Sequence, residues 1–236
     1  MDTEMNAKAG SRIGAKRVFD IKVVVVLSML SAIAYIVASL IRIPLVPAVG
    51  FLGYEPKDVV LVIAGFIYGP LAPLVMAAVI ALLEGFTTSV MGPIGIPMNF
   101  IASCAFACTA SFIYKKNRSI AGATIGLSVA VVVTTFVMLL WNYALTPILL
   151  GHPRHVVEAL LIPGFLPFNL IKGALNAAIA MLLYKPIRKA LGKSRLLPVL
   201  PAPTSRSSKI SVGVVLASVF VIITCTLVVL SWRGII

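Results

Sequence analysis

Charged side chains are scarce in this chain of 236 residues, and acidic ones are the scarcest. Asp and Glu together number 7, against 20 Lys and Arg, and charged residues make up 11% of the sequence. Soluble domains carry about 25% charged residues, so this composition excludes an ordinary soluble protein. The balance is basic, with a formal net charge of +13.

A phosphate-binding loop of the Walker type is missing, which excludes nucleotide hydrolysis by this chain in the usual way. Carboxylates are nearly absent from the apolar segments, where Glu84 is the one candidate for a proton relay or an ion-coupling site. If the protein pumps a solute, the energy must therefore come from other subunits or from an ion gradient.

Cysteine and histidine are rare as well. Cys104, Cys108 and Cys225 fall inside apolar segments without histidine at ligand spacing, so they predict small buried side chains and neither a zinc site nor a disulfide framework. His152 and His155 fall in a loop between two apolar segments, where solvation is favoured over metal binding because few other ligands are near. We expect no metal and no resident cofactor.

Hydrophobic residues make up 60% of the chain, and the mean hydropathy is +1.08. They gather in seven segments that favour membrane-spanning helices: 23–41, 57–69, 71–91, 97–114, 121–141, 165–184 and 210–232. The second is short and ends at Gly69 and Pro70, which break a helix, so the second and third segments predict a tight hairpin. The fold class predicted is an all-α integral membrane protein.

The basic residues are distributed unevenly around these segments. If the N-terminus is cytoplasmic, the basic residues that flank the predicted spans fall on cytoplasmic segments. The exceptions are Arg42, Lys57, Arg154 and Arg233, which fall outside. Such a bias orients a polytopic protein and attracts anionic lipid. It predicts a multi-pass cell-membrane protein with a cytoplasmic N-terminus and, after seven spans, an outside C-terminus. It argues against nucleic-acid binding.

Lys172 lies about two turns inside the sixth apolar segment. A cation at the bilayer centre costs about 2.5–3.5 kcal/mol, so this position calls for a reason. One alternative is that the side chain extends to water from near the helix end. The favoured interpretation is an inward-facing polar stripe, because Asn169 and Asn176 share its helix face, and we interpret this stripe as half of a small-molecule site.

Other polar residues lie at a similar depth, toward the predicted outer face. They are Glu84, Asn99 and Asn142, with Asn169 and Lys172. Amides, a carboxylate and an ammonium would suit a planar ligand rich in hydrogen-bonding groups, together with nearby aromatic residues at 86, 141, 143 and 168. A single asparagine could instead cap a helix or bridge two helices. For Glu84 the alternatives are an ion pair with Lys172 and exposure to water outside.

Small residues form a flat face on the first span, where Ser31, Ala34 and Ala38 follow one another at helical spacing. Such a face permits close approach of another helix. The partner could be a helix of the same chain or a second membrane protein.

Four motifs resemble the signature of riboflavin-specific substrate-binding (S) components of energy-coupling factor (ECF) vitamin transporters. They are FLGYEPKD at 51–58, GFIYGPLA at 65–72, WNY at 141–143 and NLIKG at 169–173. The resemblance covers about residues 20–190. It implies a six-helix core that binds riboflavin near the outer surface, and a transport function with no enzymatic activity.

The resemblance also implies roles for individual residues. It places Asn142, Asn169 and Lys172 at the polar edge of the isoalloxazine ring, with Leu52 and Glu55 closing over the ligand from the first outer loop. It leaves open whether flavin mononucleotide (FMN) also binds.

Four further residues are assigned with less support from a motif. Asn99 and Glu84 join the predicted binding site by their depth alone. The spacing of Ala34 and Ala38 looks like the alanine motif with which S components dock onto the transmembrane coupling subunit, which acts with two ATPase subunits. These subunits and the lipid bilayer are the expected partners.

The domain organisation follows from these assignments. Residues 1–20 predict a basic cytoplasmic segment, 21–190 the six-helix membrane domain, 191–209 a basic, proline-rich linker, and 210–236 an additional transmembrane helix. The six-helix pattern gives no role for this last helix.

Other functional classes are kept as alternatives. A stand-alone secondary carrier or facilitator for a vitamin-like solute would need an ion site or passive flux. A retinal photoreceptor would need its lysine on the last helix, and a membrane enzyme would need a nucleophile or metal cluster that the sequence does not show.

Overall fold

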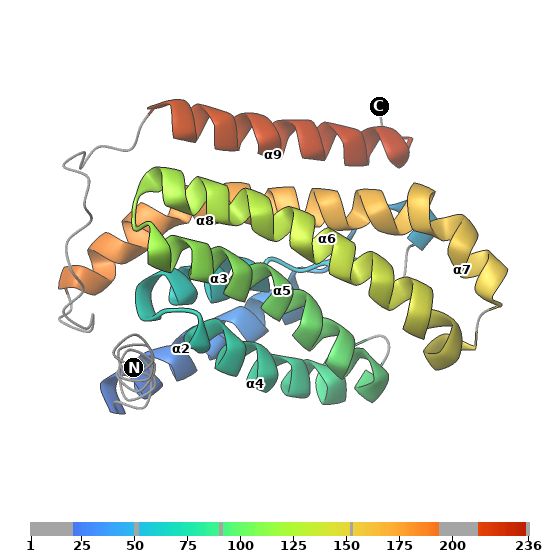
Figure 1. Cartoon of the computed structure of the whole chain (residues 1–236), viewed down its shortest axis with the longest axis horizontal. Coiled ribbons are helices and arrows are strands. Elements are labelled where there is room, and N and C mark those ends of the chain that lie inside the picture. Colours follow the sequence, from blue (N-terminus) through green and yellow to red (C-terminus); the bar gives the residue numbers. More distant parts are fainter. Residues whose placement is uncertain (1–20, 50–51, 90–91, 152, 194–211, 235–236) are drawn as a thin grey trace, which may run out of the picture.

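The computed structural model of the chain describes residues 21–49, 52–89, 92–151, 153–193 and 212–234. Long helices run side by side along the long axis of the molecule, and a short two-stranded ribbon lies at one end of the bundle (Figure 1). The elements in chain order are α2 (Ile21–Leu40), β1 (Ile43–Pro44), η1 (Pro47–Val49), β2 (Gly53–Tyr54), α3 (Lys57–Tyr68), α4 (Leu71–Thr87), η2 (Gly92–Ile94), α5 (Gly95–Lys116), α6 (Ile120–Leu150), α7 (Arg154–Leu160), the π-helical η3 (Leu161–Phe165), α8 (Leu166–Lys193) and α9 (Val212–Trp232).

Five of the helical segments are long and apolar enough to cross a membrane: Ile21–Leu40, Gly92–Lys116, Ile120–Ile148, Arg154–Tyr184 and Val212–Trp232. Two shorter helices, α3 with 12 residues and α4 with 17, lie in the sequence between the first two of these segments. At 1.5 Å per residue, α3 is about 18 Å long, so it reaches only part of the way across a bilayer core of about 30 Å.

The predicted hairpin between the second and third segments is present as α3 and α4. Gly69 ends α3 with a φ of 95°, in the left-handed region that glycine adopts without strain. Pro70 follows as the N-cap of α4, and Pro73 lies in the first turn, where a missing N–H costs no helical hydrogen bond. Gly65 lets α5 approach closely, because a Cβ atom there would collide with the Ser111 hydroxyl.

The sixth predicted helix begins earlier than expected. Two short segments, α7 and the π-helical η3, lead into α8 without leaving the helical path. His155 is exposed on α7, so the expected loop is partly helical there, and His152 lies outside the described residues.

The fifth predicted helix is longer than expected. It was predicted to end at residue 141, whereas α6 continues to Leu150 and contains Pro147. Asn142 therefore lies within a helix and not at its end. A sequence boundary drawn at polar residues was wrong here, because Asn142 and Thr146 hydrogen-bond within α6: the Thr146 hydroxyl donates to Asn142 Oδ1 at 3.0 Å.

The small-residue face of α2 packs inside the protein. Ala34 has no exposed surface and Ala38 is 5% exposed, on the side of α2 that contacts α3 and α4. The expectation that these alanines form an accessible docking face is wrong for this arrangement. Helical spacing places residues on one face, but neighbouring helices decide whether that face points inward.

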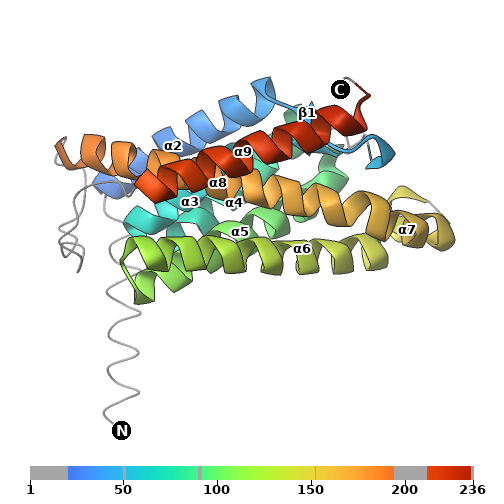
Figure 2. The same ribbon diagram turned by 90° about the horizontal axis from the view of Figure 1, so that it is seen from above.

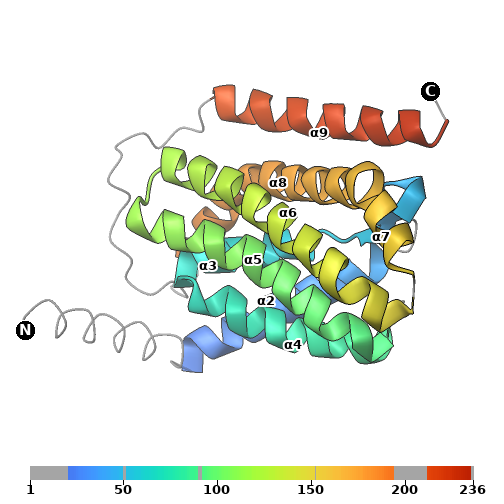
Figure 3. The same ribbon diagram turned by 45° about the vertical axis from the view of Figure 1, so that its right-hand side comes forward.

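The additional helix, α9, lies along α8 on the side of the bundle away from α4 (Figures 1 and 2). Figure 3 shows it as a separate layer above α6 and α8. Among its described residues Ser218 and Val229 are buried, and its remaining side chains are partly or fully exposed, as expected of a helix that faces lipid.

Candidate functional site

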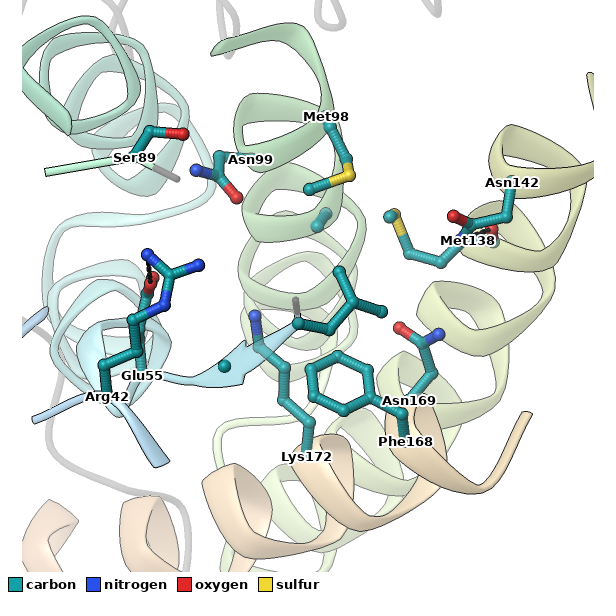
Figure 4. A pocket seen from close by; sticks show the side chains of 13 residues that line it. Arg42, Glu55, Ser89, Met98, Asn99, Met138, Asn142, Phe168, Asn169 and Lys172 are labelled. Atoms are coloured by element: carbon teal, nitrogen blue, oxygen red, sulfur yellow. Dashed lines mark hydrogen bonds and ion pairs between the residues drawn. The ribbon is translucent and has the colours of Figure 1, made fainter. Parts of the chain in front are cut away.

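A polar cavity lies near the β-ribbon, between the chain that follows α2 and the helices α5, α6 and α8 (Figure 4). It is lined by Arg42, Leu52, Gly53, Glu55, Ser89, Met98, Asn99, Ala102, Met138, Asn142, Phe168, Asn169 and Lys172. Its volume is about 40 Å³. Ligand pockets for drug-sized molecules measure about 300–1,000 Å³, so the cavity is contracted in this conformation.

One wall comes from the segment between α2 and α3, called here the β-ribbon loop (residues 41–49 and 52–56). Its strands pair antiparallel, with Ile43 opposite Tyr54. Arg42 Nη1 lies 3.6 Å from Glu55 Oε1, and Gly53 leaves room for the Arg42 side chain, which a Cβ atom would strike. Figure 4 shows this pair on one side of the cavity, opposite Met138 and Asn142.

Behind this wall is a buried cluster of charges centred on Lys57. Its ammonium contacts Glu84 Oε2 and lies 3.0 Å from Glu55 Oε2. Lys57 and Glu84 are each 2% exposed. Asn99 Nδ2 lies 3.4 Å from Glu84 Oε2, which connects the cluster to the cavity.

The structure adds to two sequence-based assignments. Lys57, predicted on an outer segment, is buried at the start of α3. Glu84 was considered as a partner of Lys172 or as exposed to water, and the structure pairs it with Lys57 instead. Glu84 does not line the cavity.

Lys172 reaches the cavity from α8 and pairs with a carboxylate that sequence reasoning overlooked. Its Nζ atom lies 3.8 Å from Oδ2 of Asp58, in the first turn of α3. Asp58 is 2% exposed, and it also accepts hydrogen bonds from the Ser103 hydroxyl at 2.6 Å and from Asn176 Nδ2 at 3.4 Å. Lys172 therefore points inward, as the polar stripe predicted, with its ammonium directed at Asp58 and its side chain 17% exposed.

The two asparagines of the predicted ring-edge site also reach the cavity. Asn142 Nδ2 donates to the Met138 carbonyl at 2.6 Å, and Asn169 Nδ2 donates to the Phe165 carbonyl at 2.8 Å. Both are buried. These bonds to their own helices hold the amides in place in the contracted cavity, and a ligand would compete for them.

The structure brings together most of the predicted site residues. Cavity-lining positions include Leu52, Glu55, Asn99, Asn142, Asn169 and Lys172. Of the predicted aromatic residues, Phe168 lines the cavity. Phe86 is 74% exposed, and Tyr143 stacks beneath Arg154 at the surface, so neither contributes to the cavity.

Several lining residues were missed by sequence reasoning. They are Arg42, Ser89, Met98, Ala102 and Met138. Methionine and alanine in an apolar helix carry no signal that separates a cavity wall from core. Asp58 could have been recognised from the sequence as a candidate site residue, because an acidic residue next to a lysine at the start of an apolar segment is unusual.

The charges around the cavity balance. Arg42, Lys57 and Lys172 are each paired with a carboxylate among Glu55, Asp58 and Glu84. In the part of the chain that the structure describes, no three metal-ligating side chains meet in a cluster. The arrangement can offer amide and charge-paired hydrogen bonds to a polar solute between apolar side chains.

A bundle of apolar, membrane-length helices with a polar cavity at one end is the architecture of a membrane-embedded binding protein. The profile of the family "ECF transporter, substrate-specific component" matches residues 22–184. The chain belongs to this family, and it is a transporter component and not an enzyme.

Relatives and a solved structure agree with this assignment. A "Riboflavin transporter RibU" of Staphylococcus aureus (strain TCH60) is 33% identical over 176 residues, which is 72% of this chain and 92% of the relative. The "Riboflavin transporter FmnP" of Bacillus subtilis (strain 168) is 31% identical over 184 residues, 74% of this chain and 96% of the relative. The structure described as the S component of a bacterial ECF transporter is 34% identical, with a TM-score of 0.61, over 71% of this chain and 96% of that one.

These findings confirm the resemblance seen in the sequence motifs and the prediction of an all-α, multi-pass membrane protein. The matched family region ends before α9, which begins at Val212. The cavity lies within the matched region.

Proposed function

We propose that this chain binds riboflavin in the cavity between the β-ribbon loop and α5, α6 and α8. The observation that carries the proposal is the convergence of residues from separate segments on one cavity, with Leu52 from the loop, Asn142 from α6, and Asn169 and Lys172 from α8. Two similar proteins are named riboflavin transporters. When the cavity walls move apart, Met98, Met138 and Phe168 would offer apolar surfaces to a planar ring, while the polar groups set its orientation.

Asn142, Asn169 and Lys172 are the proposed hydrogen-bonding partners of the ring edge. Leu52 and Glu55 cover the ligand from the β-ribbon loop, and Asn99 contributes from α5. Glu84 has a different role from the one first assigned: it supports Lys57 and Asn99 from behind the cavity wall.

The charge balance favours a neutral ligand over a phosphorylated one. A phosphate group carries about −1.5 to −2 charges at neutral pH and binds best to cations that are free to meet it. Arg42 and Lys172, the cations that line the cavity, are already paired with Glu55 and Asp58. We therefore propose that riboflavin binds more tightly than FMN.

Titration of the purified protein with riboflavin tests this function. Bound flavin stacked among aromatic and sulfur-containing side chains should lose fluorescence, with saturation at one ligand per chain. Protein purified from flavin-containing cells should also show the visible absorption of flavin. A titration without saturable quenching would reject the proposal.

We also propose that uptake requires an ECF coupling subunit with two ATPase subunits. Family membership supports this assignment, and the sequence lacks a nucleotide-binding loop. The N-terminus is proposed to be cytoplasmic and the C-terminus outside, which puts the cavity toward the outer face.

The outward face of α2 is the proposed docking surface, in place of Ala34 and Ala38. Ser28 and Ala32 are exposed small residues one turn apart on this face, flanked by Met29 and Ile33. The additional helix α9 leaves this face uncovered, because it packs on α8 (Figure 1). Small residues at that spacing allow helices to approach closely in lipid.

The stand-alone carrier remains the function to test against this one. Liposomes that contain the purified chain alone should bind riboflavin but should not concentrate it. Concentrative uptake without the coupling subunits would establish a secondary carrier instead.

A further inference from the structure

The additional helix α9 contacts the wall of the cavity at its C-terminal end. Arg233, which follows the helix, donates from Nη2 to the Pro44 carbonyl of β1 at 2.5 Å. Val229, one turn earlier, is 8% exposed. It belongs to one apolar cluster with Leu45, Val46, Val49, Leu52 and Tyr54 of the β-ribbon loop and with Phe168, Ile171 and Leu175 of α8.

The same loop forms part of the cavity wall. Leu52 belongs both to this apolar cluster and to the cavity lining, while Gly53 and Glu55 line the cavity beside it. A displacement of the loop from α9 would therefore also move a cavity-lining side chain. Figure 2 shows the C-terminal end of α9 next to β1.

The opposite end of α9 is held less closely. An apolar crevice of about 350 Å³ separates it from α6 and α8, with Ala217, Ser218 and Val221 on the α9 side. The helix thus has its specific polar contact at the end that meets the β-ribbon loop.

We propose that α9 positions the β-ribbon loop over the cavity, with Arg233 and Val229 as the residues through which it acts. The cavity holds about 40 Å³, so a flavin-sized ligand enters only when its walls move apart. Outward motion of the loop stretches the contact between Arg233 and Pro44 and exposes Val229. The helix that lies beyond the matched family region therefore slows both the entry and the exit of ligand.

Hydrogen exchange of the full-length protein in detergent tests this positioning without any ligand. Arg233→Ala and Val229→Ala are compared with the wild type, and amide exchange is followed in residues 43–49. Loss of one hydrogen bond or one small apolar contact should speed local exchange by about 3- to 10-fold, because exchange reports local opening. Amides in α5 and α6 should keep their wild-type rates.

Two matched controls separate positioning from general loosening. Leu227→Ala removes apolar surface from the same helix at a side chain that is 50% exposed. Arg154→Ala removes another exposed arginine, which stacks on Tyr143 of α6. Both should leave exchange in residues 43–49 unchanged.

A second measurement rests on the proposed function, since it uses riboflavin as the probe. Stopped-flow fluorescence should show association and dissociation that are both about 3- to 10-fold faster in Arg233→Ala, with a smaller change in their ratio. A residue that merely stabilised the fold would not raise both rates together.

The two measurements can fail separately. Wild-type exchange rates in both α9 variants, or equal acceleration in the Leu227→Ala control, would overturn the positioning role. Accelerated exchange in a protein that does not bind riboflavin would keep that role and reject the proposed ligand. Unchanged binding kinetics in a variant with accelerated exchange would overturn the claim that the loop limits ligand entry.

Discussion

Asp58 offers the sharpest test of how the site works, because it pairs with Lys172 from a different helix. Replacing Asp58 with Asn keeps the side-chain shape and a group that can bond to Ser103 but removes the negative charge. At 3.8 Å and an effective dielectric constant of about 20, the lost attraction to Lys172 is about 4 kcal/mol. This value is an upper bound for the effect on binding, since the Lys172 side chain is 17% exposed and can reorient.

We expect Asp58→Asn to weaken riboflavin binding by about 1–2 kcal/mol, because an unpaired Lys172 no longer points at the ligand position. The decisive measurement is a double-mutant cycle with Lys172→Ala. If Asp58 acts through Lys172, adding Asp58→Asn to Lys172→Ala should change affinity by less than about 0.5 kcal/mol.

Thermal unfolding, monitored by circular dichroism, tests the pairing of Asp58 and Lys172 independently of ligand binding. Asp58→Asn should destabilise the wild type, which retains Lys172. In the Lys172→Ala background the same substitution should stabilise the protein, because it removes a carboxylate that would otherwise be buried without its cationic partner. Additive losses of affinity, or destabilisation in both backgrounds, would refute the idea that the two residues act as a pair.

Three further predictions concern Glu84, Asn169 and the two faces of α2. Glu84→Gln should destabilise the protein by about 3 kcal/mol in a denaturation assay. This loss is at the low end for a broken buried ion pair, because Lys57 keeps its contact with Glu55. An unchanged denaturation midpoint would show that the pair of Lys57 and Glu84 does not contribute to stability. Asn169→Ala should weaken riboflavin binding by about 1–3 kcal/mol with little change in helix content, measured by fluorescence titration and circular dichroism. Ala32→Trp should block uptake by cells with coupling subunits while sparing ligand binding. Ala34→Leu should instead lower the stability of the protein by about 1–3 kcal/mol, because the larger side chain overpacks the core. If Ala34→Leu blocked uptake and Ala32→Trp did not, the docking surface would be the face of α2 that carries Ala34 and Ala38.

Local spacing predicted part of the site correctly. Asn169, Lys172 and Asn176 are three and four residues apart, so helix geometry alone places them on one face. Because a buried cation is costly, the same sequence indicates that this face points inward. The structure confirms the inward orientation.

The partners of these residues were not predictable in the same way. Asp58 is 114 positions from Lys172, and no periodicity connects them. Glu84 illustrates the difficulty, since its depth suggested Lys172 as a partner and the fold supplied Lys57. The side of α2 that Ala34 and Ala38 occupy was likewise decided by the helices that pack against it.

The sequence by itself determined that the chain is a helical membrane protein with a polar face on its sixth predicted span, because hydropathy and helical periodicity are local properties of the chain. Tertiary structure alone decided which charges meet, which face of α2 remains open, and that α9 touches the β-ribbon loop. Those outcomes depend on contacts between distant segments, and such contacts are settled only when the helices pack together.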